Sequence, residues 1–269
     1  MKMRCFILVA LALCLAVPPR AGRAAEVPAC DAAAPHEKAL FASVDERLEI
    51  ILADGRRVYF PTLEPPRATA IEPERPKHVA EELTSLLEGK SLDLIALGVR
   101  DRWGRIPARL FVEGEAESVE EILAVSGLVM ASGASANGES GACRKALLAA
   151  EAAARGDRLG IWADPEFAVI SPGDGANLAA RAGIVTLVEG RIASIGHTAP
   201  RLYLNFGAGS GGFSLTIARR LLPLFDRAGL AEKNLLHQSI RVRGVVEIGA
   251  APQIELFHPD QIEFMEDRR

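Results

Sequence analysis

The sequence is poor in the residue types that carry several common functions. Its 269 residues include only four cysteines and five histidines, and none of these lies at a metal-ligand or catalytic-triad spacing. We therefore expect neither a zinc site nor a histidine-based triad. Aromatic residues make up 5% of the chain and include only two tryptophans, so few side chains are available for stacking on nucleic-acid bases.

The chain also lacks an apolar run long enough to span a bilayer. The longest apolar run lies at the N-terminus. Lys2 and Arg4 precede an apolar stretch over residues 5–17, which ends at two prolines and is followed by small residues at 21–25. A basic start, a short apolar core and a small-residue exit are the three parts of a secretory signal. Thirteen apolar residues are too few to span a bilayer. The sequence predicts a signal peptide over residues 1–24, cleavage before Ala25 or Glu26, and a periplasmic or secreted protein without a transmembrane segment.

Positive charge becomes scarcer once the signal is removed. Residues 1–24 hold four of the 31 basic residues (Lys2, Arg4, Arg20 and Arg23) and no acidic ones, so the mature chain carries 27 basic and 35 acidic residues, a net charge of −8. Proteins that grip a nucleic-acid backbone usually do so through excess lysine and arginine. Nucleic acid is therefore a disfavoured partner, and an envelope protein or another ligand fits the charge better.

Two cysteines remain after processing, Cys30 and Cys143. In an oxidising compartment two cysteines most simply form one disulfide. The pairing would fasten the N-terminal segment to the rest of the chain.

Elements over residues 25–164 alternate between strands and helices. Residues 48–52 and 57–60 flank Asp54-Gly55 and predict a hairpin. Apolar spacing predicts helices over 77–88, 119–125 and 143–154. Two further strands are expected over 92–97 and 107–112, and a loop over the Gly- and Ser-rich stretch 132–141.

The pattern changes after a proline- and glycine-rich stretch at 165–182, which is interpreted as a linker. Six short strands and one helix, over about 218–228, are expected in residues 183–269 and predict a small, partly open barrel. Arg241 and Arg243 alternate on one of these strands, a pattern typical of solvated charges, although they could instead contact a polyanion. Gly207–Gly212 is interpreted as a hairpin loop because it lies between two strands.

Several ordered motifs resemble those of staphylococcal-nuclease-like (thermonuclease-like) proteins. Residues 101–108, Asp-Arg-Trp-Gly-Arg-Ile-Pro-Ala, resemble the Asp-x-Tyr-Gly-Arg-x-x-Ala turn of this family, and Glu151 to Trp162 resembles its final helix. Ser126-Gly127-Leu128 and the Asp54-Gly55 hairpin also match. The resemblance covers about residues 44–164. It implies an α+β fold, mainly β with helices, with an OB-type five-stranded barrel followed by the second small barrel-like domain.

The resemblance also implies a site for calcium-dependent hydrolysis of phosphodiesters, and here the sequence departs from the family. Tyr59 stands in place of an arginine, Arg67 in place of the base glutamate, and Leu48 in place of a metal carboxylate. Arg105 alone keeps its family residue, and Glu64 could replace the metal-binding aspartate. Losing a general base costs about 10²–10⁴-fold and losing a charge-stabilising group about 10²–10³-fold.

Two readings of the retained residues stay open. Arg105 is a phosphate ligand in the active family, or a turn arginine paired with Asp101. Trp103 and Trp162 could stack on bases, but core packing is the commoner role. We expect a degenerate site without a cofactor in a non-catalytic binding or scaffolding module. The alternative is a calcium-dependent nuclease of DNA or RNA that uses Glu64 and Arg105.

Overall fold

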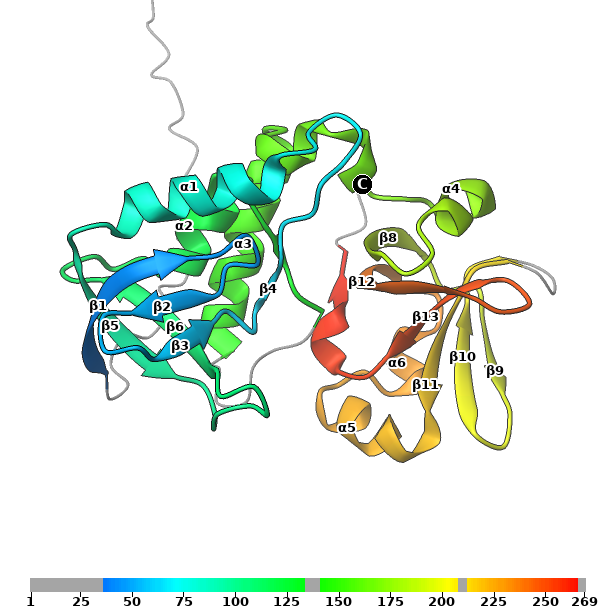
Figure 1. Ribbon diagram of the computed structural model, residues 1–269. Coiled ribbons are helices and arrows are strands. Elements are labelled where there is room, and N and C mark those ends of the chain that lie inside the picture. Colours follow the sequence, from blue (N-terminus) through cyan, green and yellow to red (C-terminus); the bar gives the residue numbers. More distant parts are fainter. Residues whose placement is uncertain (1–35, 134–140, 208–211, 266–269) are drawn as a thin grey trace, which may run out of the picture.

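The computed structural model describes residues 36–133, 141–207 and 212–265 of the chain. The predicted signal peptide and Cys30 lie outside these residues, as does most of the predicted loop at 132–141. Figure 1 shows two lobes side by side, a barrel lobe (residues 36–164) and a C-terminal lobe (residues 165–265). No helix in the described ranges is long and apolar enough to cross a membrane.

Five strands close the barrel in the order β1-β2-β3-β6-β5, which confirms the predicted five-stranded barrel. The strands pair antiparallel except β3 and β6, which run parallel. β6 is buried along its whole length, because it lies between its two neighbours and under the helices. The strands of this lobe are β1 Glu37–Val44, β2 Ile50–Leu52, β3 Arg57–Tyr59, β5 Ser91–Ala96, β6 Ile106–Val112 and, outside the barrel, β4 Leu63–Glu64 paired with β7 Met130–Ala131.

Three helices cover one side of the barrel (Figure 1). They are α1 Arg75–Leu87, α2 Val119–Val125 and α3 Gly141–Gly156. α1 buries Val79, Leu83 and Leu87 at helical spacing, and Gly89 follows it with a φ of +71°. α2 begins at a capping box in which Ser118 and Glu121 bond each other's backbone N–H groups. Because these signals are local, the predicted helices lie within a few residues of the observed ones.

Two glycines join α2 to the end of α3. Gly127 and Gly160 have φ values of +68° and +50°, and the Ile161 N–H donates to the Gly127 carbonyl at 2.8 Å. A Cβ on Gly127 would collide with the Leu159 carbonyl, and one on Gly160 would collide with the Gly127 carbonyl. The two motifs that the sequence analysis singled out separately therefore meet in one backbone contact that only glycine permits.

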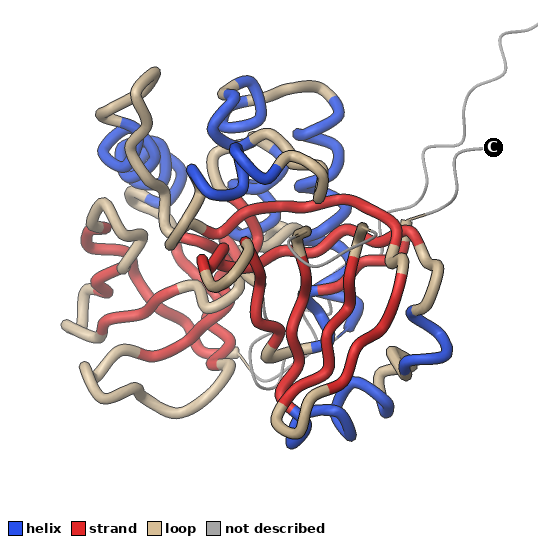
Figure 2. The backbone as a smooth tube through the Cα atoms, turned by 90° about the vertical axis from the view of Figure 1, so that its right-hand side faces the viewer, coloured by secondary structure: helices blue, strands red, loops and turns tan. Residues whose placement is uncertain are grey.

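The C-terminal lobe is built on a seven-stranded sheet, whose strands face the viewer in Figure 2. Its path runs β14-β12-β13-β11-β10-β9, and β8 also pairs with β12. The lobe is rich in strands, as predicted, and β10 and β11 form the expected antiparallel pair. Its elements are β8 Val185–Arg191, β9 Ser194–His197, β10 Arg201–Asn205, β11 Ser214–Ala218, α5 Leu222–Arg227, α6 Glu232–Leu235, β12 Ser239–Ile248, β13 Pro252–Leu256 and β14 Ile262–Phe264.

The stretch predicted as a linker packs against both lobes. It holds the short helices η2 Pro165–Phe167 and α4 Gly175–Ala180, and it buries Ile170 and Leu178 in the core of the C-terminal lobe. A separate apolar cluster joins the lobes and contains Met130 and Trp162 of the barrel lobe and Leu187 of β8. The lobes are therefore held together by side chains that each lobe contributes.

Candidate functional site

A cavity of about 300 Å³ opens on the barrel lobe between the residues just before β2, the end of β3, β4 and Arg105. The fold brings together four of the residues that the sequence singled out, since the lining includes Leu48, Tyr59, Glu64 and Arg105. Arg67 does not line it. The complete lining is Arg47, Leu48, Glu49, Tyr59, Phe60, Pro61, Leu63, Glu64, Pro65, Arg105 and Ser132.

The Arg105 guanidinium is held by two carboxylates and an aromatic ring. Its Nε donates to Asp101 Oδ2 at 2.9 Å, and its Nη1 donates to Glu49 Oε2 at 3.4 Å. The Tyr59 ring lies over it, with 4.7 Å from the guanidinium carbon to the ring centroid. Arg105 thus makes the predicted turn pairing with Asp101, and its charge is matched inside the protein.

Asp101 organises this turn as well as pairing with Arg105. Its Oδ1 accepts the backbone N–H groups of Trp103 at 2.9 Å and Arg105 at 3.0 Å. Burial raises the pKa of Asp101, but the hydrogen bonds from Arg105 and Trp103 outweigh it and hold the pKa below its usual value. Asp101 is therefore ionised at neutral pH and keeps the turn closed.

Glu49 is the site residue that the sequence analysis missed. It is 7% exposed, and its two carboxylate oxygens pair with Arg57 and Arg105. The preceding residue, Leu48, takes a φ of +61° and packs in the barrel core. The sequence did hold an indication of this role, because Glu49 is an acidic residue at the start of an apolar strand. Burying a carboxylate there costs free energy unless a cation pairs with it.

Arg67, which the resemblance aligned with the family's base, lies outside the cavity and bonds the segment that follows the barrel lobe. Its Nη1 donates to Glu166 Oε2 at 2.9 Å and its Nη2 to the Glu166 carbonyl at 2.9 Å. Its guanidinium also lies 4.3 Å from the centroid of the Phe167 ring. The ion pair between Arg67 and Glu166 therefore joins the loop after β4 to the segment after α3.

Glu64 lies at the junction of the two lobes. Burial raises the pKa of its carboxyl group, while the charges of Arg243 and Arg144 and the N–H of Gly133 act in the opposite direction. No described residue forms an ion pair with it. Glu64 also lines two further cavities, both of which extend to the C-terminal lobe. Of all the residues predicted for the site, Glu64 is the one that the second lobe approaches.

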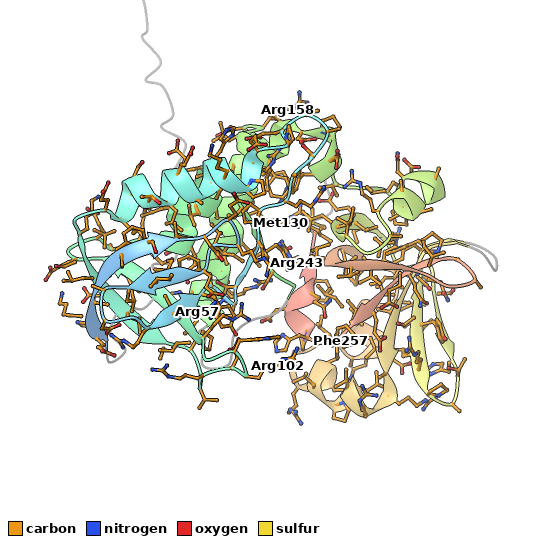
Figure 3. All side chains as sticks on the ribbon, in the orientation of Figure 1. Arg57, Arg102, Met130, Arg158, Arg243 and Phe257 are labelled. Carbon is orange, nitrogen blue, oxygen red and sulfur yellow. The ribbon has the colours of Figure 1, made fainter. Side chains whose placement is uncertain are left out.

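A buried ion pair connects the lobes behind this carboxylate. Arg243 of β12 is completely buried and binds Glu151 of α3 through two hydrogen bonds of 2.9 Å. Its guanidinium also donates to the Ala131 carbonyl at 2.9 Å and to Glu263 at 2.7 Å. Figure 3 shows Arg243 between the two lobes. The prediction of a solvated Arg243 is wrong, because docking of the lobes removes this strand face from water.

The two tryptophans differ. Trp162 is buried in the cluster between the lobes, as predicted. Trp103 is 57% exposed, which contradicts the prediction of core packing. The guanidinium carbons of Arg102 and Arg105 lie 4.0 and 4.8 Å from the centroid of its ring. Cation–π stacking at the tip of a turn thus replaces burial.

Residues 75–164 match the family model described as staphylococcal nuclease homologue. The chain carries a staphylococcal nuclease-like domain. The matched stretch runs from α1 to the end of η1 (Gly160–Ala163) and includes Arg105. It begins after residues 45–67, the segment in which Leu48, Tyr59, Glu64 and Arg67 lie. A search of curated proteins finds no match to this chain.

Inside the cavity, Arg105 is bonded by carboxylates of the protein itself. Among the described residues, no group of three or more His, Cys, Asp or Glu side chains is placed to hold a metal ion. The carboxylates of the cavity are Glu49, which is bonded to two arginines, and Glu64, which faces the C-terminal lobe.

Proposed function

We propose that this protein is a non-catalytic binding or scaffolding module, in which a nuclease-like domain and the C-terminal lobe together present a ligand site. The observation that carries the proposal is the state of Arg105. Its guanidinium bonds Asp101 and Glu49 and lies under the Tyr59 ring. A phosphate that approaches Arg105 meets a guanidinium whose charge two carboxylates already match, so it gains less free energy than it would at an arginine without such partners.

Phosphodiester hydrolysis also needs a group that accepts the proton of the attacking water. Arg67 stands where the resemblance places that base, and it is bonded to Glu166 outside the cavity. A guanidinium cannot accept a proton at neutral pH. This arrangement supports a site that binds without cleaving.

The donor set of the cavity supports the absence of a calcium cofactor. Calcium takes about six to eight oxygen ligands, several of them from carboxylates. Glu49 gives its oxygens to Arg57 and Arg105, and Leu48 has no oxygen in its side chain. Of the two carboxylates that line this cavity, Glu64 is the one without an ion pair to a described residue. These residues do not fit a calcium ion, and we derive no step through one.

The N-terminal signal pattern supports work outside the cytoplasm, in the periplasm or in the secreted fraction, where an envelope protein or ligand would be the partner. Intact mass of the protein recovered from the periplasm tests the assignment. We expect a chain that begins at Ala25 or Glu26. Full-length protein in the cytoplasm would contradict it.

A digestion assay tests the proposed function. The purified protein is incubated with single-stranded DNA in calcium and in chelator, and we expect the same background in both. Arg105→Ala and the matched exposed-arginine variant Arg227→Ala serve as the test and the control. A calcium-dependent activity that co-purifies with the protein and is lost in Arg105→Ala but not in Arg227→Ala would contradict a non-catalytic site.

The alternative function is a calcium-dependent nuclease. One observation favours it: Glu49, Glu64 and Arg105 line the same cavity, so two carboxylates and the retained arginine are close together. On this alternative, Glu49→Gln would abolish digestion by removing a carboxylate of the site. On the non-catalytic function, the same substitution changes only stability.

A further inference from the structure

A second cavity, of about 290 Å³, lies between the two lobes and shares Pro61, Glu64 and Ser132 with the cavity of the nuclease-like domain. Its other walls come from Gly133 of the barrel lobe and from β8, β12, β13 and the residues after β13 in the C-terminal lobe. We call it the interlobe groove. Neither lobe forms it alone, and each of the two neighbouring cavities is at the lower end of the size range of ligand pockets.

One wall of the interlobe groove is apolar and open to solvent. Phe257 is 56% exposed and Val245 is 43% exposed, although both are large apolar side chains. Figure 3 shows Phe257 of the C-terminal lobe and Arg102 of the nuclease-like domain on facing sides of the junction. Apolar surface of this kind at the edge of a cavity gains free energy when a ligand covers it.

The polar groups of the groove carry negative charge. Its lining includes Glu64, Glu247 and Glu255, and none of the described residues that line it is a lysine, arginine or histidine. Glu255 pairs with Arg201 at 3.2 Å outside the lining, whereas Glu64 and Glu247 form no ion pair with any described residue. The charges of Arg243 and Arg144 both act on Glu64, but neither residue lines the groove, and the charge of Arg243 is matched by Glu151 and Glu263.

An apolar wall beside unpaired carboxylates selects a particular kind of ligand. Lysine and arginine side chains combine an aliphatic stem with a cationic end, so they cover apolar surface and satisfy a carboxylate at once. A nucleic-acid strand is repelled by the same carboxylates. A neutral apolar ligand leaves them unpaired, at the cost of burying a charge.

We propose that the interlobe groove binds an extended segment of a partner protein that presents a lysine or arginine side chain. The stem of that side chain lies against Phe257 and Val245, and its cationic end pairs with Glu64 and Glu247. This assignment rests on the proposed non-catalytic function and names the kind of partner that the site takes. It places the partner where both lobes are in contact with it.

Fluorescence anisotropy of the mature chain at about 0.15 M salt tests the assignment. The probe is a labelled ten-residue peptide with two lysines and two leucines in a glycine–serine background, and its control carries glutamates in place of the lysines. We expect the lysine peptide to bind at least about tenfold more tightly than the glutamate peptide. Glu64→Gln and Phe257→Ala should each weaken binding about tenfold, and Glu247→Gln by about threefold.

The matched control is Glu82→Gln, which removes an exposed carboxylate from α1, away from the groove. It changes the net charge of the protein as Glu64→Gln does, so it should leave binding unchanged if the groove is the site. Equal weakening by the two substitutions, or no binding at millimolar peptide, would overturn the assignment. Binding of a single-stranded DNA oligonucleotide that Glu64→Gln strengthens would overturn it in favour of nucleic acid.

The two proposals fail in different ways. Calcium-dependent digestion that requires Arg105 contradicts the non-catalytic function, whatever the peptide does. A Glu64→Gln variant that binds the lysine peptide like the wild type, in a preparation without digestion, contradicts only the groove assignment.

Discussion

Arg243 and Glu151 form an ion pair that is closed to water and joins two parts of the chain 92 residues apart. The guanidinium comes from β12 of the C-terminal lobe and the carboxylate from α3 of the nuclease-like domain, whose Oε1 also accepts from Arg155 and Oε2 from the Ala131 N–H. Every oxygen of this carboxylate is therefore bonded. The pair fixes the geometry of the junction at which the candidate site and the interlobe groove meet.

Removing one member of this pair should be strongly destabilising. Arg243→Ala leaves Glu151 buried without its main partner, and we expect a loss of about 3–5 kcal/mol in the free energy of unfolding. Urea unfolding measures it. Arg201→Ala, which breaks a half-exposed pair within the C-terminal lobe, should cost less than about 1 kcal/mol. The double variant Arg243→Met, Glu151→Leu should recover most of the loss. A single-variant loss no larger than that of Arg201→Ala would show that the pair does not hold the lobes.

The same pair should make stability fall in acid. Burial raises the pKa of Glu151, but Arg243, the Ala131 N–H and Arg155 outweigh it and lower the pKa to about 2. A group with a lowered pKa in the folded state stabilises above its unfolded value near 4.5, and this stability is lost as the pH falls toward 2. Urea unfolding at pH 6, 4 and 3 should show the loss in the wild type and a weaker dependence in Glu151→Gln. The same pH dependence of the free energy of unfolding in both proteins would contradict this prediction.

Glu120 should make the stability of the protein fall as the pH rises, whereas Glu151 makes it fall as the pH drops. It is 1% exposed, and burial raises the pKa of its carboxyl to about 7, which Arg109 at 3.5 Å offsets only in part. With a raised folded pKa, its contribution is complete below about pH 4.5 and is lost as the pH rises through 7. The wild type should therefore lose stability relative to Glu120→Gln between pH 5 and pH 8. An unchanged difference between the two proteins over this range would argue against a buried, neutral Glu120.

Gly127→Ala should lower the free energy of unfolding by more than an ordinary glycine substitution does. Both a left-handed backbone and the collision of a Cβ with the Leu159 carbonyl oppose the alanine. Gly114 is a matched control, because its φ is +87° but a Cβ there meets nothing within 4 Å. We expect about 1–2 kcal/mol for Gly114→Ala and at least about 3 kcal/mol for Gly127→Ala in thermal or urea unfolding. Equal losses would show that the contact with residues 159–160 relaxes freely.

The predicted Cys30–Cys143 disulfide is open to a direct chemical test. Cys143 is buried among Ile95, Leu97 and Phe111, and Cys30 lies outside the described residues. The bond would close a loop of about 113 residues and stabilise by about 4–5 kcal/mol on the chain-entropy model. Peptide mapping of the exported protein without reductant should find the cross-linked pair. Two thiols that alkylate in the native protein would rule it out.

Local signals in the sequence located the helices of the barrel lobe. The helix predicted over residues 119–125 has the same bounds as α2, because the capping box of Ser118 and Glu121 is a local feature that fixes where the helix begins. β1 was not predicted, since only Ala39 of its eight residues is buried and the strand lacks clean alternation. β12 reaches Ser239–Ile248 because pairing with β8, β13 and β14 extends the strand beyond its apolar residues.

The sequence by itself determined the hairpin at Asp54-Gly55, the helices of the barrel lobe, and the turn that Asp101 and Arg105 share, since each depends on residues close together in the chain. Only the tertiary structure decided that Arg243 is buried, that Glu49 neutralises Arg105, and that Glu64 faces a groove shared by both lobes. From the sequence alone, a charged residue in a strand is interpreted as facing solvent, because its ion-pair partner is not known. Here that partner, Glu151, lies 92 residues away on another lobe, and the free energy of the pair depends on water being excluded when the lobes meet.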